Sequence, residues 1–224
     1  MVRAASVALA LIAAACGSSA QPAPSATPTP AASPTVAASP STGGPWTFSV
    51  DASSKTTIRV REVLASTRAP GDAVLTVTGM RGSFTLNTDG TFSPTSKLTA
   101  DLATVSSDSG LRDRYVRDTT LDVRRFPTAE FVPARTTGLT LPLAASGDLA
   151  FRIEGKMTVH GTAKDVTFAV KATRSGTRLV AAATADPAWT FADFGLAIPR
   201  VSSVLSVEDE IRLEIALVAT EAAP

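Results

Sequence analysis

From Trp46 onward, apolar and polar residues alternate along most of the chain with a period of two. The clearest runs are residues 151–160, 165–174 and 211–217, and weaker runs occupy 46–50, 56–63, 73–78, 82–86, 97–105, 129–134 and 177–186. Such alternation is typical of strands with one buried and one solvated face. Turn-forming pairs such as Asp89-Gly90 and His160-Gly161 separate several runs. About eight or more strands from Trp46 onward predict an all-β fold, a barrel or a sandwich, and we interpret the domain as an antiparallel β-barrel.

One segment departs from the alternation. In residues 109–121, Leu111, Tyr115 and Val116 fall on one helical face. We therefore expect a short helix of one or two turns between two strands.

The inward face of the predicted barrel mixes large residues with small ones such as Ala100, Ala129 and Gly155. About eight strands enclose an interior that side chains can fill, or that can hold one small ligand. Alternation alone leaves both alternatives open, and a register error of one residue would turn a strand's whole set outward. The candidate lumen residues are Phe48, Ile58, Val60, Phe84, Leu102, Phe131, Phe151, Ile153, Met157, Phe168, Val170, Phe194, Leu213 and Ile215.

The first residues, 1–15, carry Arg3 followed by a run rich in Ala, Val, Leu and Ile. This run is shorter than the roughly 20 residues that cross a bilayer, and it fits the apolar region of a secretory signal peptide. Ala13, Ala14 and Ala15 precede Cys16, the one cysteine, in a way that resembles a bacterial lipobox, although that pattern prefers Leu at the position of Ala13. We expect Cys16 to be the lipid attachment site. Ordinary signal cleavage with Cys16 as an incidental thiol is the alternative.

Residues 16–45 follow as a tether rich in Pro, Ala, Ser and Thr. Seven of the fifteen prolines fall in 17–45, which has no charged residue, so this stretch cannot bury enough apolar surface to fold. Its prolines favour extended, semi-stiff conformations. We therefore divide the chain into a signal peptide (1–15), a lipidated tether (16–45) and a barrel domain (46–221). This arrangement predicts a membrane-anchored lipoprotein on the extracytoplasmic side, in the periplasm or at the cell surface.

Charge and composition narrow the function classes. The formal net charge of +1 argues against nucleic acid as a partner, since such proteins carry a basic face or stripe. One His and one Cys cannot form a His/Cys metal centre. A carboxylate-based metal site is the alternative, but no motif supports it, and we expect no metal and no cofactor. A Ser-His-Asp triad would need His160, but this residue precedes Gly161 at a predicted turn. We expect no enzymatic activity.

Four segments, in this order and spacing, resemble the YceI family of bacterial secreted proteins. They are RDRYVR at 112–117, LDVRRFPTAEF at 121–131, GKMTVHGTAKDVTF at 155–168 and DFGL at 193–196. The resemblance covers about 46–219. It implies a lipocalin-like antiparallel barrel with a short helix at its mouth, and a polyisoprenoid-type or similar long amphiphilic lipid in the lumen. A homodimer is also open, because related barrels are often dimers. The usual pattern has His where Tyr115 stands.

The leading hypothesis is therefore a barrel that binds, sequesters or carries an isoprenoid-type lipid. Arg112, Tyr115 and Arg117 are the candidate head-group residues at the mouth, although neighbouring aspartates could instead pair with the arginines. The alternative is a surface interaction or structural barrel without a lumenal ligand. A carboxylate enzyme comes third, because the alternation identifies no convergent pair of inward carboxylates.

Overall fold

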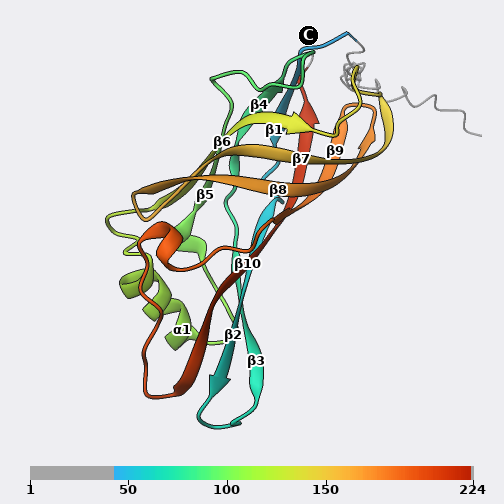
Figure 1. Ribbon diagram of the computed structural model, residues 1–224. Coiled ribbons are helices and arrows are strands. Elements are labelled where there is room, and N and C mark those ends of the chain that lie inside the picture. Colours follow the sequence, from blue (N-terminus) through green and yellow to red (C-terminus); the bar gives the residue numbers. More distant parts are fainter. Residues whose placement is uncertain (1–42, 223–224) are drawn as a thin grey trace, which may run out of the picture. The chain divides into compact units, whose positions relative to one another are not determined.

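The alternating runs form ten antiparallel strands in residues 43–222, the part of the chain that the computed structural model describes (Figure 1). The strands are β1 (Trp46–Val50), β2 (Lys55–Leu64), β3 (Pro70–Val77), β4 (Arg81–Leu86), β5 (Lys97–Asp101), β6 (Thr128–Thr137), β7 (Ser146–Val159), β8 (Thr162–Ser175), β9 (Arg178–Ala185) and β10 (Val204–Glu221). The predicted signal peptide, Cys16 and the tether up to residue 42 lie outside the described residues.

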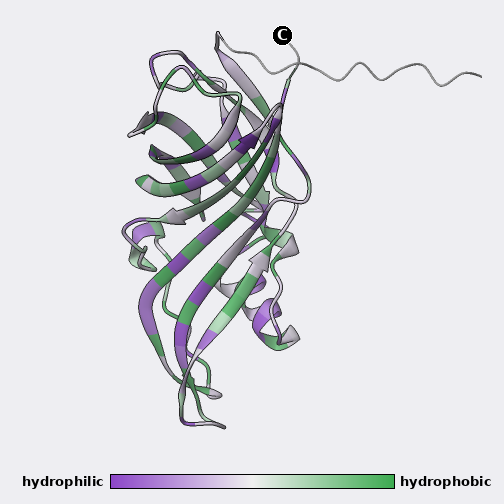
Figure 2. Cartoon of the chain, turned by 90° about the vertical axis from the view of Figure 1, so that its right-hand side faces the viewer, coloured by the Kyte–Doolittle hydropathy of each residue, from purple (hydrophilic) through white to green (hydrophobic). Residues whose placement is uncertain are grey.

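Eight of these strands close into a barrel in the order β1-β4-β5-β6-β7-β8-β9-β10, with β10 pairing back to β1. The predicted antiparallel barrel is thereby confirmed. Figure 2 shows apolar and polar bands alternating along the long strands, which matches the period of two. In β8, for example, Val166, Phe168, Val170 and Ala172 are buried while their neighbours are more exposed.

The remaining two strands extend the sheet beyond the barrel. The last part of β10 pairs with β1, and its earlier part pairs with β2, whose other edge carries β3. Backbone hydrogen bonds between Thr76 and Ser106 then tie β3 to the segment after β5. Figure 1 shows this extension facing α1. Residues of β2, β3 and α1 together line a cavity.

The helical prediction for 109–121 is confirmed. An α-helix, α1 (Gly110–Tyr115), continues directly into a π-helical turn, η2 (Val116–Thr120). The Ser109 side chain caps α1 by accepting a hydrogen bond from the Arg112 backbone N–H. None of the helices in the described residues is long and apolar enough to cross a membrane.

Several strand boundaries differ from the predicted runs, and two of the differences have a local cause in the sequence. The run 97–105 stays extended only to Asp101, because the Asp101 carboxylate caps the 3₁₀ turn η1 (Leu102–Thr104) through the Ala103 backbone N–H. The last strand begins at Val204, seven residues before the predicted run 211–217, so Glu208, Asp209 and Glu210 lie within β10. The register of β10 against β2 shifts there, between Val207 and Ile211, so the acidic residues form a bulge in the strand.

One end of the barrel is closed by packed side chains and a buried ion pair. Phe48 stacks on Phe84 with ring centroids 5.3 Å apart, and Phe48 itself is buried. Beyond these rings, Arg174 donates to the Glu221 carboxylate at 2.5 Å, and the two side chains are only 0% and 1% exposed. The Arg174 guanidinium also donates to the carbonyl oxygens of Leu143, Ala144 and Gly176. Because the Arg174 charge is fully paired and hydrogen-bonded, it can be buried. The Arg174–Glu221 ion pair and the stacked rings close this end of the barrel.

Candidate ligand-binding cavity

The other half of the interior holds a cavity of about 720 Å³, within the range usual for small-molecule sites. Its wall is formed by the inner faces of β2, β3, β5, β6, β7 and β10, by α1 and η2, and by the segment between β9 and β10. Exposed residues of this wall, Ser66, Leu111 and Ser203, mark its opening to solvent, which we call the mouth.

Some of the predicted lumen residues lie on the cavity wall. They come from β2, β6, β7 and β10 and from the turns η1 and η3 (Ala192–Phe194), and they are Ile58, Val60, Leu102, Phe131, Met157, Phe194, Leu213 and Ile215. Their contact with a ligand stays a prediction.

The rest of the predicted lumen residues are not on the cavity wall; they are Phe48, Phe84, Phe151, Ile153, Phe168 and Val170. They point inward as the alternation indicates, but they pack among themselves and with other buried residues in the closed half of the barrel. Phe168, for instance, meets Phe131 edge-on, with ring centroids 5.2 Å apart. Period-two alternation gives the direction of a side chain and not its depth along the barrel, which is why it could not separate the two groups.

Other residues of the cavity wall are not among the predicted lumen residues. Leu75 and Val77 of β3 and Met80 after it are buried against the cavity. So are Trp189 and Phe191, which precede η3 in a segment without alternation. Two aromatic residues in a loop next to the DFGL motif were the available signal.

The motif aspartate, Asp193, fixes this aromatic segment. Its carboxylate accepts a hydrogen bond from the Thr190 backbone N–H at 2.8 Å and pairs with the Lys164 ammonium. The hydrogen bond from Lys164, followed by that from Thr190, holds the pKa of Asp193 below its ordinary value. The turn thus presents Phe194, which contacts the Trp189 ring at a centroid distance of 5.0 Å.

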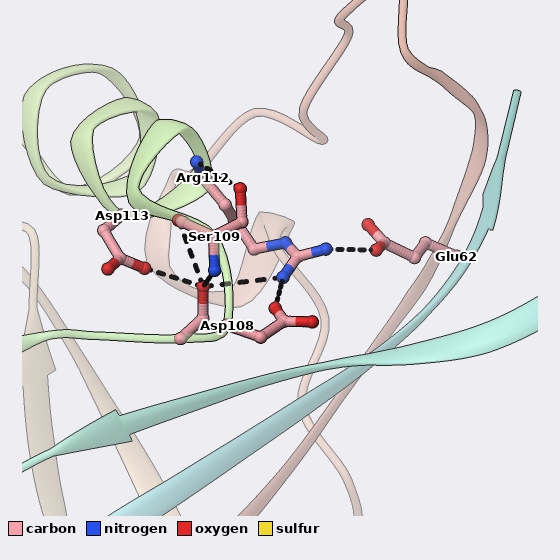
Figure 3. A network of polar contacts seen from close by, with 6 residues as sticks. Glu62, Asp108, Ser109, Arg112 and Asp113 are labelled. Atoms are coloured by element: carbon pink, nitrogen blue, oxygen red, sulfur yellow. Dashed lines mark hydrogen bonds and ion pairs between the residues drawn. The ribbon is translucent and has the colours of Figure 1, made fainter. Parts of the chain in front are cut away.

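The polar part of the wall centres on Arg112 of α1 (Figure 3). One terminal nitrogen of its guanidinium donates to the Glu62 carboxylate of β2 at 2.7 Å. The other terminal nitrogen pairs with Asp108 and donates to the Ser107 hydroxyl at 3.4 Å. The Ser107 hydroxyl in turn donates to the Asp113 carboxylate at 2.7 Å. Together these contacts, which we call the Arg112 network, tie α1 to β2 at the cavity.

The three candidate mouth residues are placed differently. Arg112 and Tyr115 line the cavity, whereas Arg117 is not on its wall and donates to the Val105 carbonyl oxygen at 2.9 Å. Glu62 was missed, although it follows Ile58 and Val60 at the same two-residue spacing. Alternation along the sequence indicates no convergent pair of inward carboxylates. The structure brings Glu62 and Asp108 together on Arg112, which uses both as ion-pair partners.

Two solved structures share the fold of this chain. A polyisoprenoid binding domain from Saccharophagus degradans superposes with a TM-score of 0.60 at 15% identity, over 78% of this chain and 98% of that one. BcnA of Burkholderia cenocepacia superposes with a TM-score of 0.57 at 19% identity, over 76% of this chain and 99% of that one. At such identities the likeness establishes the fold, a YceI-like barrel.

Sequence comparison covers the same region. A UPF0312 protein of Pseudomonas putida is 36% identical over 84 residues, which span 36% of this chain and 39% of the length of that relative. The profile of the YceI-like domain matches residues 46–219. This range contains strands β1 to β9 and most of β10. The chain therefore belongs to the YceI family.

Proposed function

We propose that the barrel binds a polyisoprenoid-type or other long-chain amphiphilic lipid in its cavity, and so sequesters or carries it. The observation that supports this most directly is the cavity itself, about 720 Å³ with a largely apolar wall, in a member of the YceI family. The Saccharophagus degradans domain with the same fold is described as polyisoprenoid binding.

The physical basis of binding would be burial of the chain against this wall. Each methylene taken out of water contributes about 0.8 kcal/mol, without a directional contact. The aromatic and aliphatic side chains of Phe131, Met157, Trp189 and Leu213 offer the surface for it. This apolar part of the wall selects chain length and shape more than chemical detail.

We further propose that the domain works outside the cytoplasm, held at a membrane by lipidated Cys16 and the proline-rich tether. The support is in the sequence, where an apolar leader ends in small residues before the one cysteine. A tether of 29 residues at ~3 Å per residue could reach roughly 90 Å when extended. Incorporation of labelled fatty acid into the wild-type chain, and its loss in Cys16→Ser, tests this part separately.

The test of lipid binding uses residues 45–224, purified, denatured and extracted with organic solvent, with the extract examined by mass spectrometry. We expect a long-chain lipid in near-stoichiometric amount. Met157→Glu places a carboxylate on the apolar cavity wall and should abolish lipid retention. Lys171→Glu, which adds a carboxylate on the exposed face of β8, is the matched control and should retain the lipid.

Two results would contradict the proposal. One is a folded Met157→Glu variant that carries the same lipid as the wild type. The other is a folded wild-type domain that stays empty after incubation with isoprenoid lipids, which would favour the surface interaction protein.

A further inference from the structure

The charges on the cavity wall are few and unbalanced. Among the described residues that line the cavity, Arg112 is the single cation, and Glu62 and Asp108 are the carboxylates. The wall therefore carries one more negative than positive charge. An anionic head group that entered the cavity would meet this excess.

The one cation is already engaged by both carboxylates. Each terminal nitrogen of Arg112 is paired, one with Glu62 at 2.7 Å and the other with Asp108 (Figure 3). The Arg112 and Glu62 side chains are only 19% and 9% exposed. A phosphate that took Arg112 would leave Glu62 buried without its partner, which is costly.

Uncharged hydrogen-bonding groups are available on the same wall. The hydroxyl oxygen of Thr120 is buried and has no hydrogen-bond partner within the described residues, and Thr120 lines the cavity. Tyr115 also lines the cavity, one π-helical turn earlier. A buried hydroxyl without a partner, such as that of Thr120, can be satisfied by a ligand oxygen, and π-helical turns are frequent at functional sites.

From these observations we infer that the polar end of the cavity accepts an uncharged head group, with a hydroxyl or carbonyl oxygen, and rejects a phosphate or diphosphate. Glu62 and Asp108 are the residues that determine this specificity, because they neutralise Arg112 and add the excess negative charge. Thr120 and Tyr115 supply the hydrogen bonds. The inference rests on the proposed function, since it names the head-group class for the same cavity.

The test compares prenyl compounds with one chain and different head groups: farnesol, farnesyl monophosphate and farnesene. Each competes with a dansyl-labelled farnesyl probe on the full-length protein in zwitterionic detergent. Energy transfer to the dansyl group from the two tryptophans, Trp46 and Trp189, reports binding, and Trp189 lies on the cavity wall. Because detergent affects every variant alike, the quantity compared between variants is the ratio of the dissociation constants of two prenyl compounds, such as farnesyl monophosphate and farnesol.

We expect farnesol to bind the wild type at least about 10-fold more tightly than farnesyl monophosphate. Glu62→Gln and Asp108→Asn should each lower this ratio by about 3-fold or more. Glu130→Gln, on the outer face of β6 where Glu130 pairs with Lys97, is the matched control and should leave the ratio unchanged. Asp108 is 85% exposed, so Asp108→Asn keeps the test valid should Glu62→Gln fail to fold.

The hydroxyl part of the inference has its own readout. Farnesol should bind the wild type about 2- to 10-fold more tightly than farnesene, and Thr120→Val combined with Tyr115→Phe should remove this difference. The inference is overturned by farnesyl monophosphate binding as tightly as farnesol, or by a ratio that neither carboxylate variant changes. Binding of none of the prenyl compounds would instead contradict the isoprenoid part of the proposed function, and this inference with it.

Discussion

Filling the cavity with one large side chain provides the sharpest test of where a lipid binds. Ala129 of β6 lines the cavity and pairs across strands with Ala100, another small wall residue. In Ala129→Phe, the added phenyl ring would take up part of the cavity. If it displaces about four ligand methylenes at ~0.8 kcal/mol each, the binding free energy weakens by about 3 kcal/mol, or roughly 200-fold in Kd.

The assay measures binding of a short and a long isoprenoid alcohol, farnesol and solanesol, to the wild type and to Ala129→Phe. The longer chain should lose more affinity, because it needs more of the 720 Å³. Ala150→Phe adds the same ring at an exposed position of β7 and is the matched control. Equal affinity of the wild type and a folded Ala129→Phe for both alcohols would refute the reasoning and place the lipid elsewhere.

Three further predictions concern stability. Glu221→Gln should lower the free energy of unfolding in urea by about 3–5 kcal/mol, because it leaves the buried Arg174 charge unpaired; a loss below about 1 kcal/mol would contradict this. Gly155→Ala should lower it by about 1–3 kcal/mol, since the new Cβ would lie 2.5 Å from a backbone carbonyl oxygen, and an unchanged Tm would argue against that clash. The lowered pKa of Asp193, caused first by Lys164, stabilises the fold above the ordinary aspartate value of 3.8, and this contribution is lost as pH falls through the lowered pKa. In Asp193→Asn, the free energy of unfolding should therefore depend less steeply on pH in that window. An acid-unfolding curve identical to that of the wild type would contradict the role given to Asp193.

The strands could be predicted because each barrel strand has one face in the core. The start of β10 could not, since residues 204–210 show little alternation and the strand is bulged there. Arg174 and Glu221 continue the inward positions of β8 and β10, but a charged residue is assigned to the core only when its partner is known. Their contact spans 47 residues of sequence.

Only part of the candidate site could be predicted from the sequence. Alternation identified inward residues such as Met157 and Phe168, but only the assembled barrel shows that Met157 meets the cavity and Phe168 the packed half. Glu62 shares the inward spacing of its strand, and its burial depends on Arg112, 50 residues away. Long-range pairings of this kind are fixed by the tertiary fold and leave no local pattern.

The unequal filling of the barrel determines the route that a ligand could take. Stacked phenylalanines and the Arg174–Glu221 pair fill one end, so passage there would require breaking a buried ion pair. At the mouth, by contrast, Leu111 lines the cavity while 80% exposed, so an apolar path already continues to the surface. The Arg112 network joins α1 to β2 at this same place. Exchange of a lipid would therefore use the α1 side, where polar contacts that can open and an exposed apolar residue lie together.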